Sequence, residues 1–187
     1  MAGGPILAAA MLAFLSASNA AELDGIPMPD RQTVGDTRLL LNGIGLQALS
    51  IFRVRIYVAG LYLEQQSDHP DRIIHSNGLK LLIMRFFHDV SAEQVRNAWR
   101  EGFEQNCQLP CYLNPGKVQG FLAAVPPVQK GDVTVLLFTS KGIEASHNGR
   151  LVGSVDDPHF AEIALATFIG PAPPTPRLKR ELLKLKE

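Results

Sequence analysis

The strand-forming run from Ser50 to Leu63 constrains the fold of this chain most strongly. Its positions alternate in character: Phe52, Val54, Ile56 and Val58 are apolar, whereas Arg53, Arg55 and Tyr57 lie between them. Alternation with period two predicts a β-strand with one face in a core. Residues two apart on a strand share a face about 7 Å apart, so we expect Arg55 and Tyr57 to lie together, facing either a cavity or solvent.

Further strands and helices are expected around this run. Ser91 to Gln94 form a capping-box pattern, and Asn148-Gly149 is a strong hairpin signal. We predict strands at 37–41 (ended by Asn42-Gly43), 50–63, 78–87, 133–139, 143–146 and 151–155, and helices at 68–75, 91–106, 116–124, 157–168 and 177–187. Strands joined by tight turns form antiparallel sheets, so the fold class is α+β, with helices on one face of a large antiparallel sheet.

The first twenty residues carry no charge. Their apolar run, Pro5 to Leu15, is shorter than the roughly 20 residues needed to span a bilayer. Small residues follow, ending at Ala20, as in a signal-peptide cleavage site. We expect residues 1–20 to be a signal peptide cleaved after about Ala20, residues 21–187 to form a single domain, and the product to be periplasmic or secreted. An uncleaved amphipathic anchor is the alternative.

Charge and composition limit the partners. Lys plus Arg and Asp plus Glu number 18 each, so the basic surface typical of a nucleic-acid-binding protein is absent. We expect no transmembrane segment after signal removal, and protein partners are left open. The tail from Arg177 to Glu187 has the pattern of a basic amphipathic helix, docked on the domain or touching a membrane.

Two cysteines, Cys107 and Cys111, lie four residues apart. An even number of cysteines in an exported protein favours a disulfide between them. Two thiols alone make a poor zinc site, and the five histidines have no ligand spacing, so we expect no metal. Gly43-x-Gly45 precedes a strand instead of a helix, so it is not a dinucleotide motif, and we expect no cofactor.

Four segments in order resemble the chalcone isomerase-like family, in particular its bacterial, exported members. They are 42–64 (NGIGLQALSIFRVRIYVAGLYLE), 90–106, 131–155 and 164–183. The resemblance implies an open-faced β-sandwich, a large antiparallel sheet carrying a layer of helices. True enzymes of this family cyclise chalcones with an arginine and a lysine at the substrate oxyanion. Related members without that activity bind fatty acids in the same cleft.

Position by position, the resemblance argues against that enzymatic activity. The catalytic arginine after Gly-x-Gly falls at Gln47, and the strand threonine falls at Tyr57. The lysine, tyrosine and asparagine positions fall near Phe86, Val95 and Gly102, which are not equivalents. Only Thr167 matches a polar substrate-contacting position. Losing one charge-stabilising donor costs ~10²–10³ in rate, so chalcone cyclisation is not expected.

We therefore expect a non-catalytic protein that binds a fatty acid or similar small amphiphile between sheet and helices. The ligand-binding residues implied are Gln47, Arg53, Arg55, Tyr57 and Thr167, with Arg85 at the rim. Two alternatives remain open. One is a protein-interaction module without a ligand. The other is an isomerase or lyase on an unknown substrate, for which Tyr57 as general acid and Arg55 as oxyanion partner are the minimum apparatus; the leading hypothesis has no catalytic residues.

Overall fold

A computed structural model of the protein describes residues 20–49 and 54–185. The strands are β1 (Ala20–Leu23), β2 (Ile26–Pro29), β3 (Arg31–Val34), β4 (Thr37–Leu49), β5 (Val54–Leu63), β6 (Lys80–Phe86), β7 (Val133–Thr139), β8 (Gly142–His147) and β9 (Arg150–Val155). The helices are α1 (Pro70–Ile74), α2 (Ala92–Asn106), α3 (Pro115–Ala123), α4 (Pro158–Ile169) and α5 (Pro176–Leu182).

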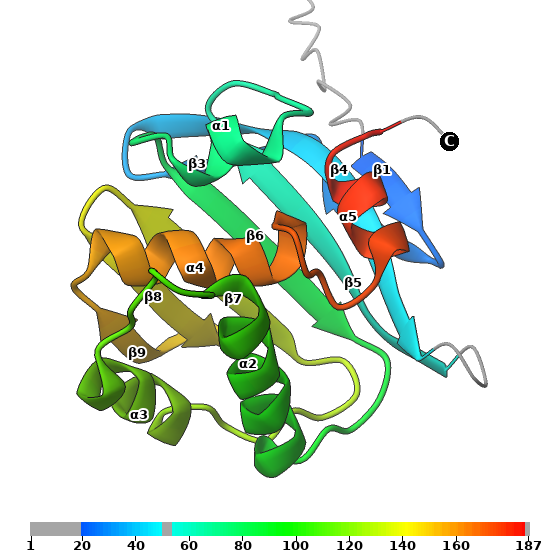
Figure 1. Ribbon diagram of the computed structural model, residues 1–187. Coiled ribbons are helices and arrows are strands. Elements are labelled where there is room, and N and C mark those ends of the chain that lie inside the picture. Colours follow the sequence, from blue (N-terminus) through cyan, green and yellow to red (C-terminus); the bar gives the residue numbers. More distant parts are fainter. Residues whose placement is uncertain (1–19, 50–53, 186–187) are drawn as a thin grey trace, which may run out of the picture.

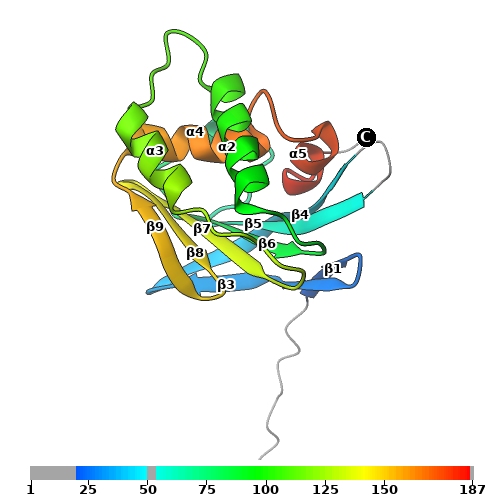
Figure 2. The ribbon, with the colours of Figure 1, turned by 90° about the horizontal axis from the view of Figure 1, so that it is seen from below.

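Strands β3 to β9 form one antiparallel sheet in which neighbours in sequence are neighbours in space (Figure 1). Strands β1 and β2 form a separate hairpin. The helices lie on one face of the large sheet and the β1–β2 hairpin lies on the other (Figure 2). The α+β class and the helix-covered antiparallel sheet are thus as predicted.

Each face of the sheet has its own apolar core. The helix-side core contains buried side chains from all five helices, such as Ile73, Trp99, Phe121, Leu165 and Leu178. The hairpin-side core joins Met28 of β2 to sheet residues that include Leu39, Val58 and Tyr62. None of the described helices has the length and apolar character required to cross a membrane.

Most predicted elements are present within a few residues of their expected ends, and the capping box at Ser91 and Gln94 is formed. The first four residues of the predicted strand 50–63 and the last two of the predicted helix 177–187 lie outside the described residues. Strands β1, β2 and β3 were not predicted. The prediction that Asn42-Gly43 ends a strand is wrong, because β4 continues to Leu49. The register against β5 shifts between Leu41 and Gly43, so Asn42 is an extra residue in a β-bulge.

Helix α5 lies directly on β4 where the strand contains glycine. A Cβ atom on Gly43 would come within 2.3 Å of the Leu182 carbonyl oxygen and within 2.4 Å of that of Glu181. A Cβ on Gly45 would lie 3.0 Å from the Leu178 side chain. The two glycines therefore permit close helix–strand contact, which is a packing role.

Buried Asn42 fixes the same contact by hydrogen bonds. Its Nδ2 donates to the Leu182 carbonyl oxygen at 2.9 Å and to that of Ser67 at 3.0 Å, and its Oδ1 accepts from the Ser67 backbone N–H at 2.8 Å. The backbone N–H of Leu46 donates to Glu181 Oε2 at 2.8 Å. The predicted C-terminal helix is thus docked on the domain, with Leu178 and Leu182 buried.

We expect Gly43→Ala to destabilise the protein, because the new methyl group would meet backbone atoms that cannot rotate away. Overpacking of this kind costs about 1–3 kcal/mol, and we expect the upper end of that range. Each kcal/mol lowers the unfolding midpoint (Tm) by roughly 2–4 °C for a chain of this size, so the Tm of this variant should be several degrees lower than that of the parent.

Gly120→Ala is the matched control. Gly120 lies in α3, and a Cβ there meets nothing within 4 Å. Alanine is about 1 kcal/mol better than glycine inside a helix, so this variant should be as stable as the parent or more stable. Equal unfolding temperatures for Gly43→Ala and the parent protein would contradict the close packing of α5 on β4.

Candidate functional site

A second β-bulge interrupts the alternation of β5. Gln47 of β4 pairs with Tyr57 and Ala48 pairs with Arg55, so Ile56 has no partner on β4. Ile56 and Tyr57 both pack against the helix-side core. In a bulge two consecutive residues oppose one, and the alternation of faces shifts by one residue.

Arg55 consequently points to the other face of the sheet. Its guanidinium carbon lies 4.8 Å from the ring centre of Phe87, a side chain of the hairpin-side core. Its Nη1 lies 3.8 Å from Asp24 Oδ2, in the turn between β1 and β2. The prediction that Arg55 and Tyr57 share one face is therefore wrong, because strict period-two alternation does not allow for the bulge at Ile56.

Tyr57 and Gln47 are cross-strand neighbours on the helix-side face. The Tyr57 ring is half-buried and meets Phe86 edge-to-face, with 5.4 Å between ring centres. Burial raises the pKa of the Tyr57 phenol, which is neutral at physiological pH. Among the described residues the Tyr57 hydroxyl has no hydrogen-bond partner.

Gln47 is held under the start of α5. Its Oε1 accepts a hydrogen bond from the hydroxyl of Thr175 at 3.1 Å, and Thr175 also caps the helix by accepting from the Leu178 backbone N–H. Within the described part of the chain, the Gln47 Nε2 donates to no partner. Tyr57 and Gln47 together thus present two neutral donors at one point of the sheet.

Thr167 occupies a different environment, at the crossing of α2 and α4. Its hydroxyl donates to the Ala164 carbonyl oxygen of its own helix at 2.7 Å. A Cβ added to Gly102 would lie 2.9 Å from its methyl carbon. Thr167 is buried between two helices and its donor is already used.

Of the two other arginines predicted at the site, Arg53 and Arg85, only Arg85 belongs to the described part of the chain, and it does not join this pair. Arg53 lies outside the described residues. Arg85 follows Met84, which faces the helix-side core, so alternation along β6 turns Arg85 to the hairpin side. Its Nε is buried without a hydrogen-bond partner among the described residues.

A groove of about 620 Å³ lies between α2 and α3. The sequence patterns did not predict it. Its lining combines Arg96 and Arg100 with apolar side chains such as Phe103 and Leu122. It contains neither Gln47 nor Tyr57. The groove depends on the angle between two helices, which no local pattern encodes.

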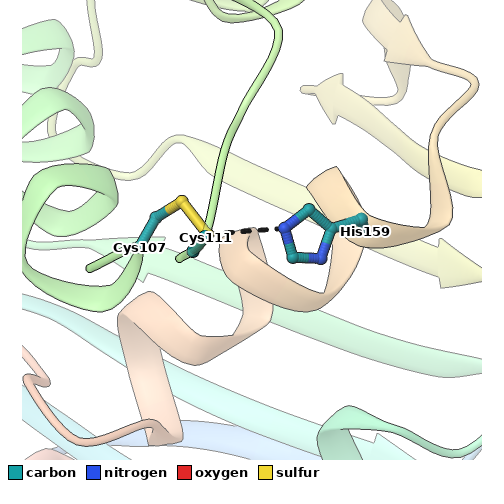
Figure 3. A group of neighbouring side chains, drawn as sticks. All are labelled: Cys107, Cys111 and His159. Carbon is teal, nitrogen blue, oxygen red and sulfur yellow. Dashed lines mark hydrogen bonds between the residues drawn. A yellow bond between two sulfur atoms is a disulfide. The ribbon is translucent and has the colours of Figure 1, made fainter. Parts of the chain in front are cut away.

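The Cys107–Cys111 disulfide lies beside this groove. His159, the second residue of α4, points its Nε2 at the Cys111 sulfur, 3.4 Å away (Figure 3). The two sulfurs and the His159 ring nitrogen all lie within 4.8 Å of one another. Forty-eight residues separate Cys111 from His159, so their sequence spacing could not have revealed this cluster.

The raised pKa of Tyr57 makes stability depend on alkaline pH. An ordinary tyrosine ionises near pH 10, so above that pH the unfolded chain loses this proton while the folded protein retains it. The free energy of unfolding should therefore fall as pH rises above about 10. The free energy of unfolding, measured with denaturant at several pH values above about 10, should decline less steeply with pH for Tyr57→Phe than for the parent protein. An equal decline with pH for both proteins would contradict the burial of this phenol.

Comparison with known proteins agrees with this architecture. The family model described as chalcone isomerase-like matches residues 20–184. A crystal structure of a fatty-acid binding protein from Arabidopsis thaliana is similar, with a TM-score of 0.72 at 16% sequence identity, covering 88% of this chain and 96% of that chain. No curated protein matches the chain. This chain belongs to the chalcone isomerase-like family.

Proposed function

We propose that this protein binds a fatty acid or a similar small amphiphile between the sheet and the helices, with the polar head at Tyr57 and Gln47. The observation that carries the proposal is the pair of unused donors at one cross-strand position. Tyr57 and Gln47 oppose each other on β5 and β4, and such side chains have Cβ atoms about 4.5–5.5 Å apart. Both could donate to a single carboxyl group.

The surroundings of this donor pair suit an acyl chain. Phe86 and Ile56 lie next to Tyr57, and the helix-side core continues beyond them with mainly apolar side chains. An acyl chain entering here would exchange contacts with water for contacts with this layer, at about 0.8 kcal/mol for each buried CH₂ group. The structural similarity to a fatty-acid binding protein supports the same ligand class.

A non-catalytic role fits this geometry better than the enzyme alternative. That alternative requires Arg55 to stabilise negative charge next to the Tyr57 phenol, but the bulge directs Arg55 towards Asp24 on the other face. Gln47 contributes a neutral amide. We therefore propose recognition of the head group by neutral hydrogen-bond donors, without a developing charge to stabilise.

Calorimetric titration of delipidated protein with saturated fatty acids of medium and long chain tests this proposal. We expect one bound fatty acid per protein. Tyr57→Phe removes one neutral hydrogen bond, with a net value of about 0.5–1.5 kcal/mol, so affinity should fall about two- to tenfold.

Two control variants locate the ligand. Arg55→Ala changes the opposite face and should leave the affinity unchanged, and Arg100→Ala changes the groove between α2 and α3 and should do the same. A larger loss in either control than in Tyr57→Phe would show that the amphiphile binds elsewhere. Absence of binding across the whole panel would favour the interaction module without a ligand.

We further propose that the protein is exported, with residues 1–20 removed. The uncharged leader supports this, as does the disulfide, since such bonds persist mainly in oxidising compartments. After expression of the full chain in a Gram-negative host, the protein should appear in the periplasmic fraction, and N-terminal sequencing should begin near Ala21. A cytoplasmic product that retains Met1 would contradict export.

A further inference from the structure

We propose that Cys107, Cys111 and His159 form a binding site for the soft cation Cu(I) when the disulfide is reduced. Three different parts of the fold contribute the ligands. Cys107 ends α2, Cys111 lies in the loop before α3, and His159 lies in the first turn of α4 (Figure 3). The three ligand atoms already lie within 4.8 Å of one another, so a single ion can reach all of them after small side-chain rotations.

The His159 ring is oriented as a metal ligand would be. Its Nε2 faces the Cys111 sulfur at 3.4 Å, and its Nδ1 lies 3.7 Å from Glu162 Oε2. Histidines that bind metals usually donate their other ring N–H to a carboxylate. Glu162 lies beside that nitrogen of His159, at an ion-pair distance that is longer than a hydrogen bond. Glu162 is itself placed between two histidines, because its Oε1 lies 3.3 Å from His75 Nδ1.

The backbone that carries these ligands is held in place by contacts outside the cluster. Asn106, next to Cys107, exchanges two hydrogen bonds with the backbone of Ala172, beyond the end of α4. Lys117 of α3 forms a 2.9 Å ion pair with Asp157, the residue that caps α4. Gly102 and Thr167 keep α2 and α4 in close contact. These contacts do not involve the disulfide, so the fold still keeps the three ligand-bearing segments close together when that bond is opened.

The ligand set favours Cu(I) over zinc. Thiolates are soft ligands that select Cu(I), zinc or iron–sulfur clusters. Structural zinc sites almost always have four protein ligands, and zinc held by three protein ligands takes a water molecule as its fourth. The cluster found in the described residues offers three, two sulfurs and one nitrogen. Cu(I) accepts two or three ligands, so this set is complete for it.

Binding requires the disulfide to be opened first. A dithiol reductant supplies two electrons and two protons, which convert the Cys107–Cys111 bond to two thiols while the reductant becomes a disulfide. Cu(I) then binds both sulfurs as thiolates and releases two protons to solvent. The redox state of the cysteines therefore switches the metal site on and off.

Titration of the purified protein with Cu(I) under anaerobic conditions, in competition with a coloured Cu(I) chelator, tests the proposal. Protein reduced with a phosphine and then desalted should bind one Cu(I), and the oxidised protein should bind none. X-ray absorption should find two sulfur neighbours and one nitrogen neighbour. His159→Ala should weaken binding at least about tenfold, the range seen when even an outer-shell partner is lost.

His69→Ala is the matched control, since His69 is an exposed histidine paired with Asp68 and is not part of the cluster. It should bind Cu(I) as the parent does. The proposal is overturned if the reduced protein binds no Cu(I) or if His159→Ala binds Cu(I) as tightly as the parent. It is also overturned if the reduced protein binds zinc as tightly as Cu(I). Because the oxidised parent protein serves as the unbound reference, the test does not depend on cysteine variants that could fail to fold. Failure of fatty-acid binding would leave this result unaffected.

Discussion

The contact between α5 and β4 organises the side of the molecule that carries the candidate site. The helix approaches so closely that backbone carbonyl oxygens occupy the space where a Cβ of Gly43 would lie, and Asn42 hydrogen-bonds to one of them. Because α5 is fixed there, its capping residue Thr175 reaches Gln47. The orientation of the Gln47 amide beside Tyr57 thus depends on how the C-terminal helix packs.

Two β-bulges give this region its particular arrangement. The extra residue Asn42 in β4 turns Asn42 and Gly43 towards α5 together, and the extra residue Ile56 in β5 does the same for Ile56 and Tyr57 towards the helices. Each bulge shifts the alternation of faces by one residue. As a result, the phenol and amide donors face the helix layer, while Arg55 contacts Asp24 and Phe87 on the hairpin side.

The Gly-x-Gly segment of β4 admits the C-terminal helix, and the residue that follows it differs between this chain and the enzymes of the family. In enzymes it is followed by a catalytic arginine, whereas here Gln47 occupies that position and hydrogen-bonds to Thr175. The glycines themselves have a structural role in this protein, since they admit the helix. A family resemblance carried by such a segment indicates the fold, and the side chain that follows the glycines bears on the chemistry.

Local patterns in the sequence determined most of the secondary structure, the antiparallel sheet with helices on one face, and the family. Hydrophobic periodicity, the capping box at Ser91 and the Asn148-Gly149 turn are short-range signals, and each depends on interactions between residues close in the chain. Only the tertiary structure decided which side chains meet. The bulge at Ile56 separated Arg55 from Tyr57, and helix α4 brought His159 to Cys111. Bulges and helix packing are set by contacts between distant segments, and such contacts leave no periodic trace in the sequence.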